Sequence, residues 1–173
     1  MIWFKYVIIA MLFFIFSWLQ ASFLPYFSVL GAIPNLIFIL FFIIVFFEQP
    51  SGWAVPITTA IIAGIISDLF LPSPFGVSIA AFLVIYFLYR IISHFLRSGQ
   101  SDHLVFYFIG MFSVLFVAYH ALLYLAGMLF PVEASLGATT FISLVYSLAF
   151  CIACFYVGKA LFAKSFDNQL KLL

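Results

Sequence analysis

Asp68 is the residue with the most evident chemical potential, because it is a carboxylate inside a long apolar stretch. An acidic side chain in that setting needs water, a hydrogen-bonding partner or a proton. His120 offers an imidazole base within another apolar stretch. A carboxylate and an imidazole that meet could exchange a proton. The first question is therefore whether the chain brings these two side chains to one place.

Four polar residues are predicted to lie at one end of their helices. Counted from the predicted helix starts, Gln20, Asp68 and His120 lie roughly 20 to 24 Å along three helices that run in the same direction. Asn35 opens a helix that runs the other way. The four could line a pocket open to the outside or contact a partner, with His120 as the partner of Asp68. Alternatively, each makes an independent hydrogen bond at the membrane interface or between helices.

Catalytic and cofactor chemistry finds little support in the sequence. A proton pathway would need a relay through the other half of the helices, and that half offers no carboxylate away from the loops. Cys151 and Cys154 have redox-type spacing but lack electropositive surroundings, so we interpret them as packing residues. There is no Gly-rich phosphate loop, zinc-ligand spacing or nucleophile elbow. The protein is expected to be no enzyme and to hold no cofactor or metal.

The composition places these residues in a membrane protein. The chain has 173 residues, of which 68% are hydrophobic and 6% charged, too few charges to cover a water-facing surface. A bilayer core needs roughly 20 apolar residues per helix. We predict an all-α membrane protein, a six-transmembrane-helix bundle forming a single integral membrane domain (1–173). The predicted spans are 4–24, 31–47, 53–70, 75–96, 104–130 and 138–162.

The charge distribution predicts an orientation. The net charge of +1 gives no nucleic-acid footprint. In the six-span arrangement all six basic residues fall on one side of the membrane, and the opposite loops contain none. The positive-inside rule then puts both termini in the cytoplasm. These basic residues are Lys5, Arg90, Arg97, Lys159, Lys164 and Lys171.

Arg90 and His94 lie four residues apart, on one face of the fourth predicted helix near its cytoplasmic end. We interpret Arg90 as reaching the lipid headgroups. A contact of Arg90, His94 and Arg97 with a cytoplasmic partner is the alternative.

At the outer end, Pro72, Pro74 and Gly76 predict a structural turn between the third and fourth helices. The third helix also carries small residues that would permit close helix packing. These are Ala60, Ala63, Gly64 and Ser67.

The order of these features resembles the rod shape-determining protein MreD family. The matching residues are Gly-Ala-Ile-Pro-Asn at 31–35, Gly-Ile-Ile-Ser-Asp-Leu at 64–69 and Pro-Ser-Pro-Phe-Gly at 72–76. The motifs cover about residues 19 to 90, and the remainder is similar in hydropathy and layout. The family usually has Pro-Asp where this chain has Pro34-Asn35.

The resemblance implies a non-enzymatic scaffold in the bacterial inner membrane, within the cell-elongation and peptidoglycan-synthesis machinery. It implies the bitopic protein MreC as a partner, and through it the MreB filament, RodA and a class B penicillin-binding protein. Asp68 would organise the outer helix ends. Helix packing, through small-residue faces or the outer polar pocket, would receive a partner segment.

The alternative is the substrate-binding S-component of an energy-coupling-factor vitamin transporter, which the MreD family resembles in overall form. S-components typically carry an Ala-x-x-x-Ala pattern on the first helix for docking the coupling subunit. Here no small residue lies four positions from Ala10 in the stretch 6–14. This absence favours the scaffold.

Overall fold

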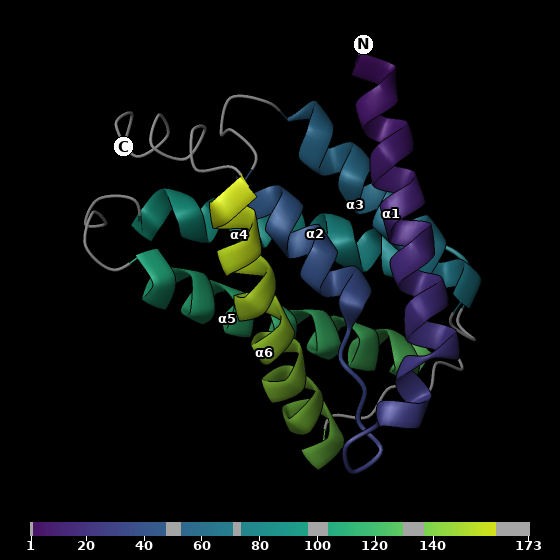
Figure 1. Cartoon of the computed structure of the whole chain (residues 1–173). Helices are drawn as coiled ribbons and strands as arrows, with labels where there is room; N and C mark the ends of the chain where they lie inside the picture. The colour runs from purple at the N-terminus through teal and green to yellow at the C-terminus, as the bar shows by residue number, and fades with distance from the viewer. Residues whose placement is uncertain (1, 48–52, 71–73, 97–103, 130–136, 162–173) are drawn as a thin grey trace.

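The computed structural model describes residues 2–47, 53–70, 74–96, 104–129 and 137–161. In these ranges the chain is nearly all helical, which confirms the predicted all-α class. An isolated bridge joins Val29 and Ala32. The elements, labelled in Figure 1, are α1 Ile2–Ser22, the 3-10 helix η1 Leu24–Phe27, α2 Leu36–Phe47, α3 Ala54–Phe70, α4 Val77–Leu96, α5 Leu104–Leu129 and α6 Ala138–Leu161.

Four of the described helices are long and apolar enough to cross a membrane, which supports a membrane protein. They contain the segments Phe4–Ser22, Val77–Phe95, Val105–Leu129 and Ala138–Tyr156. Helices α2 and α3 have 12 and 17 residues. At a rise of about 1.5 Å per residue they measure roughly 18 and 26 Å, less than the hydrocarbon core of about 30 Å.

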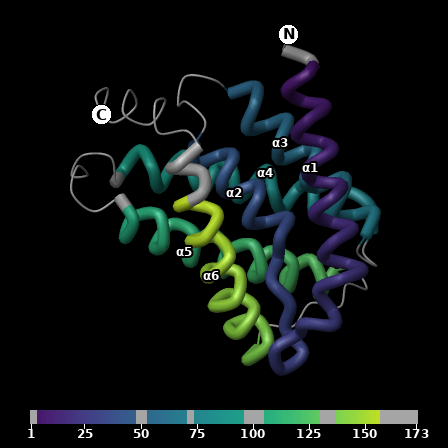
Figure 2. Tube along the Cα trace, viewed as in Figure 1, coloured from purple at the N-terminus to yellow at the C-terminus, as the bar shows by residue number. Residues whose placement is uncertain are grey.

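Consecutive helices run in opposite directions, and α4 and α5 form a hairpin that crosses α1 obliquely (Figures 1 and 2). Helix α3 packs against α1 and α4, and α5 packs against α4 and α6. Helices α1 and α3 therefore lie side by side and run the same way.

Helix α2 forms the centre of the bundle. Its residues are apolar on every side, and most are buried. It packs against α1, α3 and α6. The buried Phe38 ring reaches the other two helices, with its centroid 6.4 Å from that of Phe82 on α4 and 5.3 Å from that of Phe116 on α5. The many phenylalanines of this sequence thus fill the core as well as cover exposed faces such as Phe4 and Phe106.

Helices α3 and α4 approach closely at Gly64. A Cβ atom added to Gly64 would lie 2.4 Å from the Cα atom of Ile79 on α4. Ala60 and Ala63 on the same helix are fully buried. The prediction that small residues on this helix permit close packing is confirmed.

The helix limits agree with the predicted spans to within two residues, except at the start of α2. That span was predicted from residue 31, whereas α2 begins at Leu36. Residues Val29 to Ala32 form a tight turn with two hydrogen bonds between its ends, and Leu30 and Gly31 have φ of 51° and 78°. This left-handed backbone delays the helix until after Pro34.

Candidate functional site

Asp68 links α3 to the first turn of α4. The side chain lies near the end of α3 and is 7% exposed. Its two carboxylate oxygens accept hydrogen bonds from the backbone N–H groups of Gly76, at 2.6 Å, and Ser78, at 3.0 Å. Gly76 also accepts the first helical hydrogen bond of α4, from Ala80. Asp68 therefore caps α4 from the preceding helix, where the helix dipole favours a negative charge.

The predicted turn residues prepare this cap. Gly76 has φ of 105°, a backbone conformation that side-chain-bearing residues rarely adopt. The Pro74 carbonyl oxygen accepts a hydrogen bond from Val77 N–H at 3.4 Å. Pro72 lies outside the described residues. The turn thus directs the N–H groups of Gly76 and Ser78 towards the Asp68 carboxylate.

Asn35 caps α2. Its side-chain oxygen Oδ1 accepts a hydrogen bond from Phe38 N–H at 3.0 Å, and its own N–H donates to the Ser147 hydroxyl of α6 at 2.9 Å. A helix start leaves four N–H groups without partners inside the helix. Asn35 and Ser147 satisfy two of them here.

Gln20 of α1 satisfies two more N–H groups at the start of α2. Its side-chain oxygen Oε1 accepts from Leu36 N–H at 2.8 Å and from Ile37 N–H at 3.3 Å. The first turn of α2 is therefore capped by side chains from α1 and α6 as well as by Asn35. Three segments distant in the sequence are fixed together at this point.

Two further hydroxyl groups on α6 hold the chain that leads into α2. Ser143 donates to the Ile33 carbonyl oxygen at 2.8 Å, and Tyr146 donates to the Phe27 carbonyl oxygen at 3.3 Å. The sequence analysis missed Ser143, Tyr146 and Ser147. Their spacing at positions 143, 146 and 147 puts them on one helical face and was the available signal.

Tyr119 of α5 lies between the two caps and was also missed. Its side chain is 1% exposed. The hydroxyl group lies near the Ser67 and Asn35 side chains and close enough to Asp68 for an electrostatic effect. Residues on α2, α3 and α5 thus meet in one buried polar cluster. A tyrosine inside an apolar helix gives no sign in the sequence that its hydroxyl reaches such a cluster.

His120 does not pair with Asp68 in the described part of the chain, contrary to the predicted partnership. The Nδ1–H tautomer of His120 donates to the Phe116 carbonyl oxygen on its own helix, at 3.0 Å. The His120 and Phe116 rings also lie against each other, with centroids 4.3 Å apart. Tyr119, one residue earlier, occupies the helical face that points to Asp68, so His120 is rotated away from it.

The predicted cytoplasmic-side residues lie at the other end of the bundle. The Arg90 guanidinium carbon lies 3.4 Å from the centroid of the Trp53 ring, just before α3. This cation–π contact ties α4 to the start of α3. His94 is exposed, with its ring against Phe95. Arg97 lies outside the described residues.

Chemically, the cluster is suited to holding helices rather than to transferring groups. Both oxygens of Asp68 already accept backbone hydrogen bonds. The described residues contain no group of three or more side chains suited to a metal ion. Cys151 is buried and Cys154 half-buried, and both are free thiols.

Comparison with protein-family models, curated proteins and solved structures found no match for this chain.

Proposed function

We propose that this protein is a non-enzymatic scaffold of the bacterial inner membrane, acting in cell elongation as members of the MreD family do. The observation that carries the proposal is the Asp68 cap, in which a buried carboxylate is used to fix the start of the next helix. The residues of this cap belong to the motifs that resemble the family, Ser67-Asp68 and Pro74-Phe75-Gly76.

The proposed layout has six membrane crossings, with both termini in the cytoplasm. Two features support it. Consecutive helices alternate in direction (Figure 2), and a chain that crossed the membrane at every helix would have all six Lys and Arg residues on one side. In this layout the short α2 crosses the membrane together with the turn and the residues before it, and other helices surround it.

The mechanism would be the presentation of a rigid outer surface to MreC. The segment between α1 and α2 exposes apolar side chains, with Tyr26 85% and Leu30 79% accessible. Hydrogen bonds from Ser143 and Tyr146 hold the backbone of this segment in place. Because the backbone of this apolar segment is already fixed, it would bind a partner at little cost in conformational entropy. Through MreC the scaffold would reach the MreB filament, RodA and a class B penicillin-binding protein.

The test is co-purification with MreC from bacterial membranes. Asp68→Leu removes both acceptors for the start of α4, so the outer helix ends shift. We expect normal membrane insertion but at least a several-fold loss of recovered MreC. Asp102→Leu, in the polar stretch between the fourth and fifth helices, is the matched control and should keep wild-type recovery.

Equal recovery of MreC with Asp68→Leu and with wild type would refute the proposal. Native mass spectrometry of the purified protein supplies a second readout. A vitamin retained by the protein would point instead to an S-component of an energy-coupling-factor transporter.

A further inference from the structure

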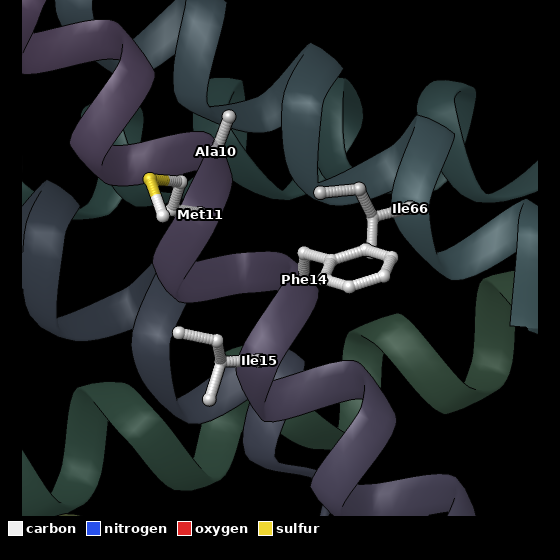
Figure 3. Close-up of a pocket in the computed structure, with 5 residues that line it drawn as sticks. All are labelled: Ala10, Met11, Phe14, Ile15 and Ile66. Atoms are coloured by element: carbon white, nitrogen blue, oxygen red, sulfur yellow. The ribbon is translucent and has the colours of Figure 1, made fainter.

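The seam between α1 and α3 is open on the surface of the molecule as two apolar grooves. The first has a volume of about 640 Å³ and is lined by Tyr6, Trp53, Ala54, Ile57 and Thr58. The second, shown in Figure 3, has a volume of about 350 Å³ and is lined by Ala10, Met11, Phe14, Ile15 and Ile66. Because α1 and α3 run the same way, the two grooves follow each other along one seam.

The length of this seam fits a lipid chain of one leaflet. From Trp53 to Ile66 the rise along α3 is roughly 20 Å, and from Tyr6 to Ile15 along α1 it is roughly 14 Å. Half of a bilayer hydrocarbon core is about 15 Å. An acyl chain that enters beside Trp53 can therefore extend along the first groove and into the second, and end near the middle of the membrane.

The entrance of the seam carries positive charge. The Arg90 guanidinium stacks on the Trp53 ring, with its central carbon 3.4 Å from the ring centroid. Within the described residues the guanidinium forms no ion pair, and the hydrogen bond from the Ser93 hydroxyl goes to the Arg90 backbone carbonyl. Stacking uses the face of the guanidinium and leaves the N–H donors on its edge, which match a phosphate group. Lys5 precedes the groove residue Tyr6 and is exposed.

We infer that the α1–α3 seam binds an anionic phospholipid of the cytoplasmic leaflet. The phosphate contacts Arg90 at the entrance, and one acyl chain occupies the two grooves. Charge complementarity selects this occupant over a partner's apolar helix, since anionic lipids are concentrated in the cytoplasmic leaflet, where the basic residues are proposed to lie. The inference concerns a ligand and stands whether or not the protein binds MreC.

The test uses the fluorescence of Trp53. In the variant Trp3→Phe/Trp18→Phe, Trp53 is the one remaining tryptophan, since the sequence has three. The protein is placed in vesicles of unlabelled phosphatidylcholine. A minor fraction of the lipid has brominated acyl chains, which quench tryptophan on contact, and is either brominated phosphatidylglycerol or brominated phosphatidylcholine. We expect brominated phosphatidylglycerol to be preferred about fivefold, the contribution of one basic residue near the membrane surface.

Variants at the entrance separate specific binding from general lipid contact. Arg90→Gln should bring quenching by the two brominated lipids to the same level, whereas Arg90→Lys should keep most of the preference. Ala54→Phe fills the first groove and should lower quenching by phosphatidylglycerol. The matched Ala153→Phe, at an exposed position of α6, should not. Helical content measured by circular dichroism verifies that each variant is folded.

Equal quenching of Trp53 by both brominated lipids, in the single-tryptophan protein with Arg90 intact, would overturn the inference. So would an absence of quenching by either lipid, because the seam would then be covered by protein.

Discussion

Individual side chains in this protein replace the hydrogen bonds that a helix start lacks. At the start of α2 the N–H groups of Asn35, Leu36, Ile37 and Phe38 all find side-chain acceptors. Inside a bilayer no water can supply these bonds, and an unsatisfied backbone group costs several kcal/mol. The polar residues of the apolar helices are thus required where a helix begins within the bundle.

Gln20 provides the first prediction, because one side-chain oxygen serves two N–H groups of α2. Gln20→Leu leaves the Leu36 and Ile37 N–H groups without acceptors and should destabilise the protein by about 1–3 kcal/mol. The measurement is the melting temperature of the detergent-solubilised protein. Gln20→Glu keeps an oxygen at the same place and should recover most of the loss. A Gln20→Leu protein as stable as wild type would contradict the role assigned to this residue.

At the residue scale the sequence predicted part of this cluster. Asn35 and Asp68 each lie near Tyr119, and Gln20 reaches α2. Which groups they bind could not be predicted, because most of the partners are backbone atoms and carry no mark in the sequence. The pairing with His120 was wrong. Its depth matched that of Asp68, but rotation about the helix axis decides which of two neighbouring residues faces inward.

At the scale of elements, the close packing of α3 against α4 depends on the absence of a side chain at Gly64. Gly64→Ala should normally stabilise a helix by up to about 1 kcal/mol. Here the new methyl group would lie 2.4 Å from the Ile79 Cα atom, a rigid backbone position. The helices must separate, and the net effect should be a loss of about 1–3 kcal/mol.

Gly110→Ala on α5 is the matched control, since nothing lies within 4 Å of the added atom. Its melting temperature should equal or exceed that of wild type. Equal melting temperatures for Gly64→Ala and Gly110→Ala would show that the two helices tolerate separation.

Helix limits were easier to predict than helix positions, because a run of apolar residues ends where polar or turn residues begin. The exception was the start of α2. The apolar residues before Pro34 are compatible with a helix. The positive φ of Leu30, which is uncommon for a leucine, could not be predicted from them. The central place of α2 could not be predicted either, since a helix that is apolar on every side fits lipid as well as a protein core.

At the scale of the whole molecule, the decisive question is whether the short pair α2 and α3 crosses the membrane. The six-crossing layout puts the connection between α2 and α3, which includes Ser51, in the cytoplasm. If only the four long helices crossed, α2 and α3 would enter the membrane from the outer side and return, and Ser51 would lie at the tip of that re-entrant hairpin. Both layouts leave Ser101, between α4 and α5, in the cytoplasm.

Single cysteines introduced at these three serines, in a Cys151→Ala/Cys154→Ala background, distinguish the two layouts. We expect a membrane-impermeant maleimide to label Ser28→Cys in intact cells with a permeabilised outer membrane, because Ser28 is exposed at the outer helix ends. Ser51→Cys and Ser101→Cys should be labelled only after lysis. Labelling of Ser51→Cys from outside would restrict the crossings to the four long helices. Such labelling would also contradict the contact between Arg90 and Trp53, which holds the start of α3 beside the basic end of α4, and with it the cytoplasmic entrance of the lipid seam.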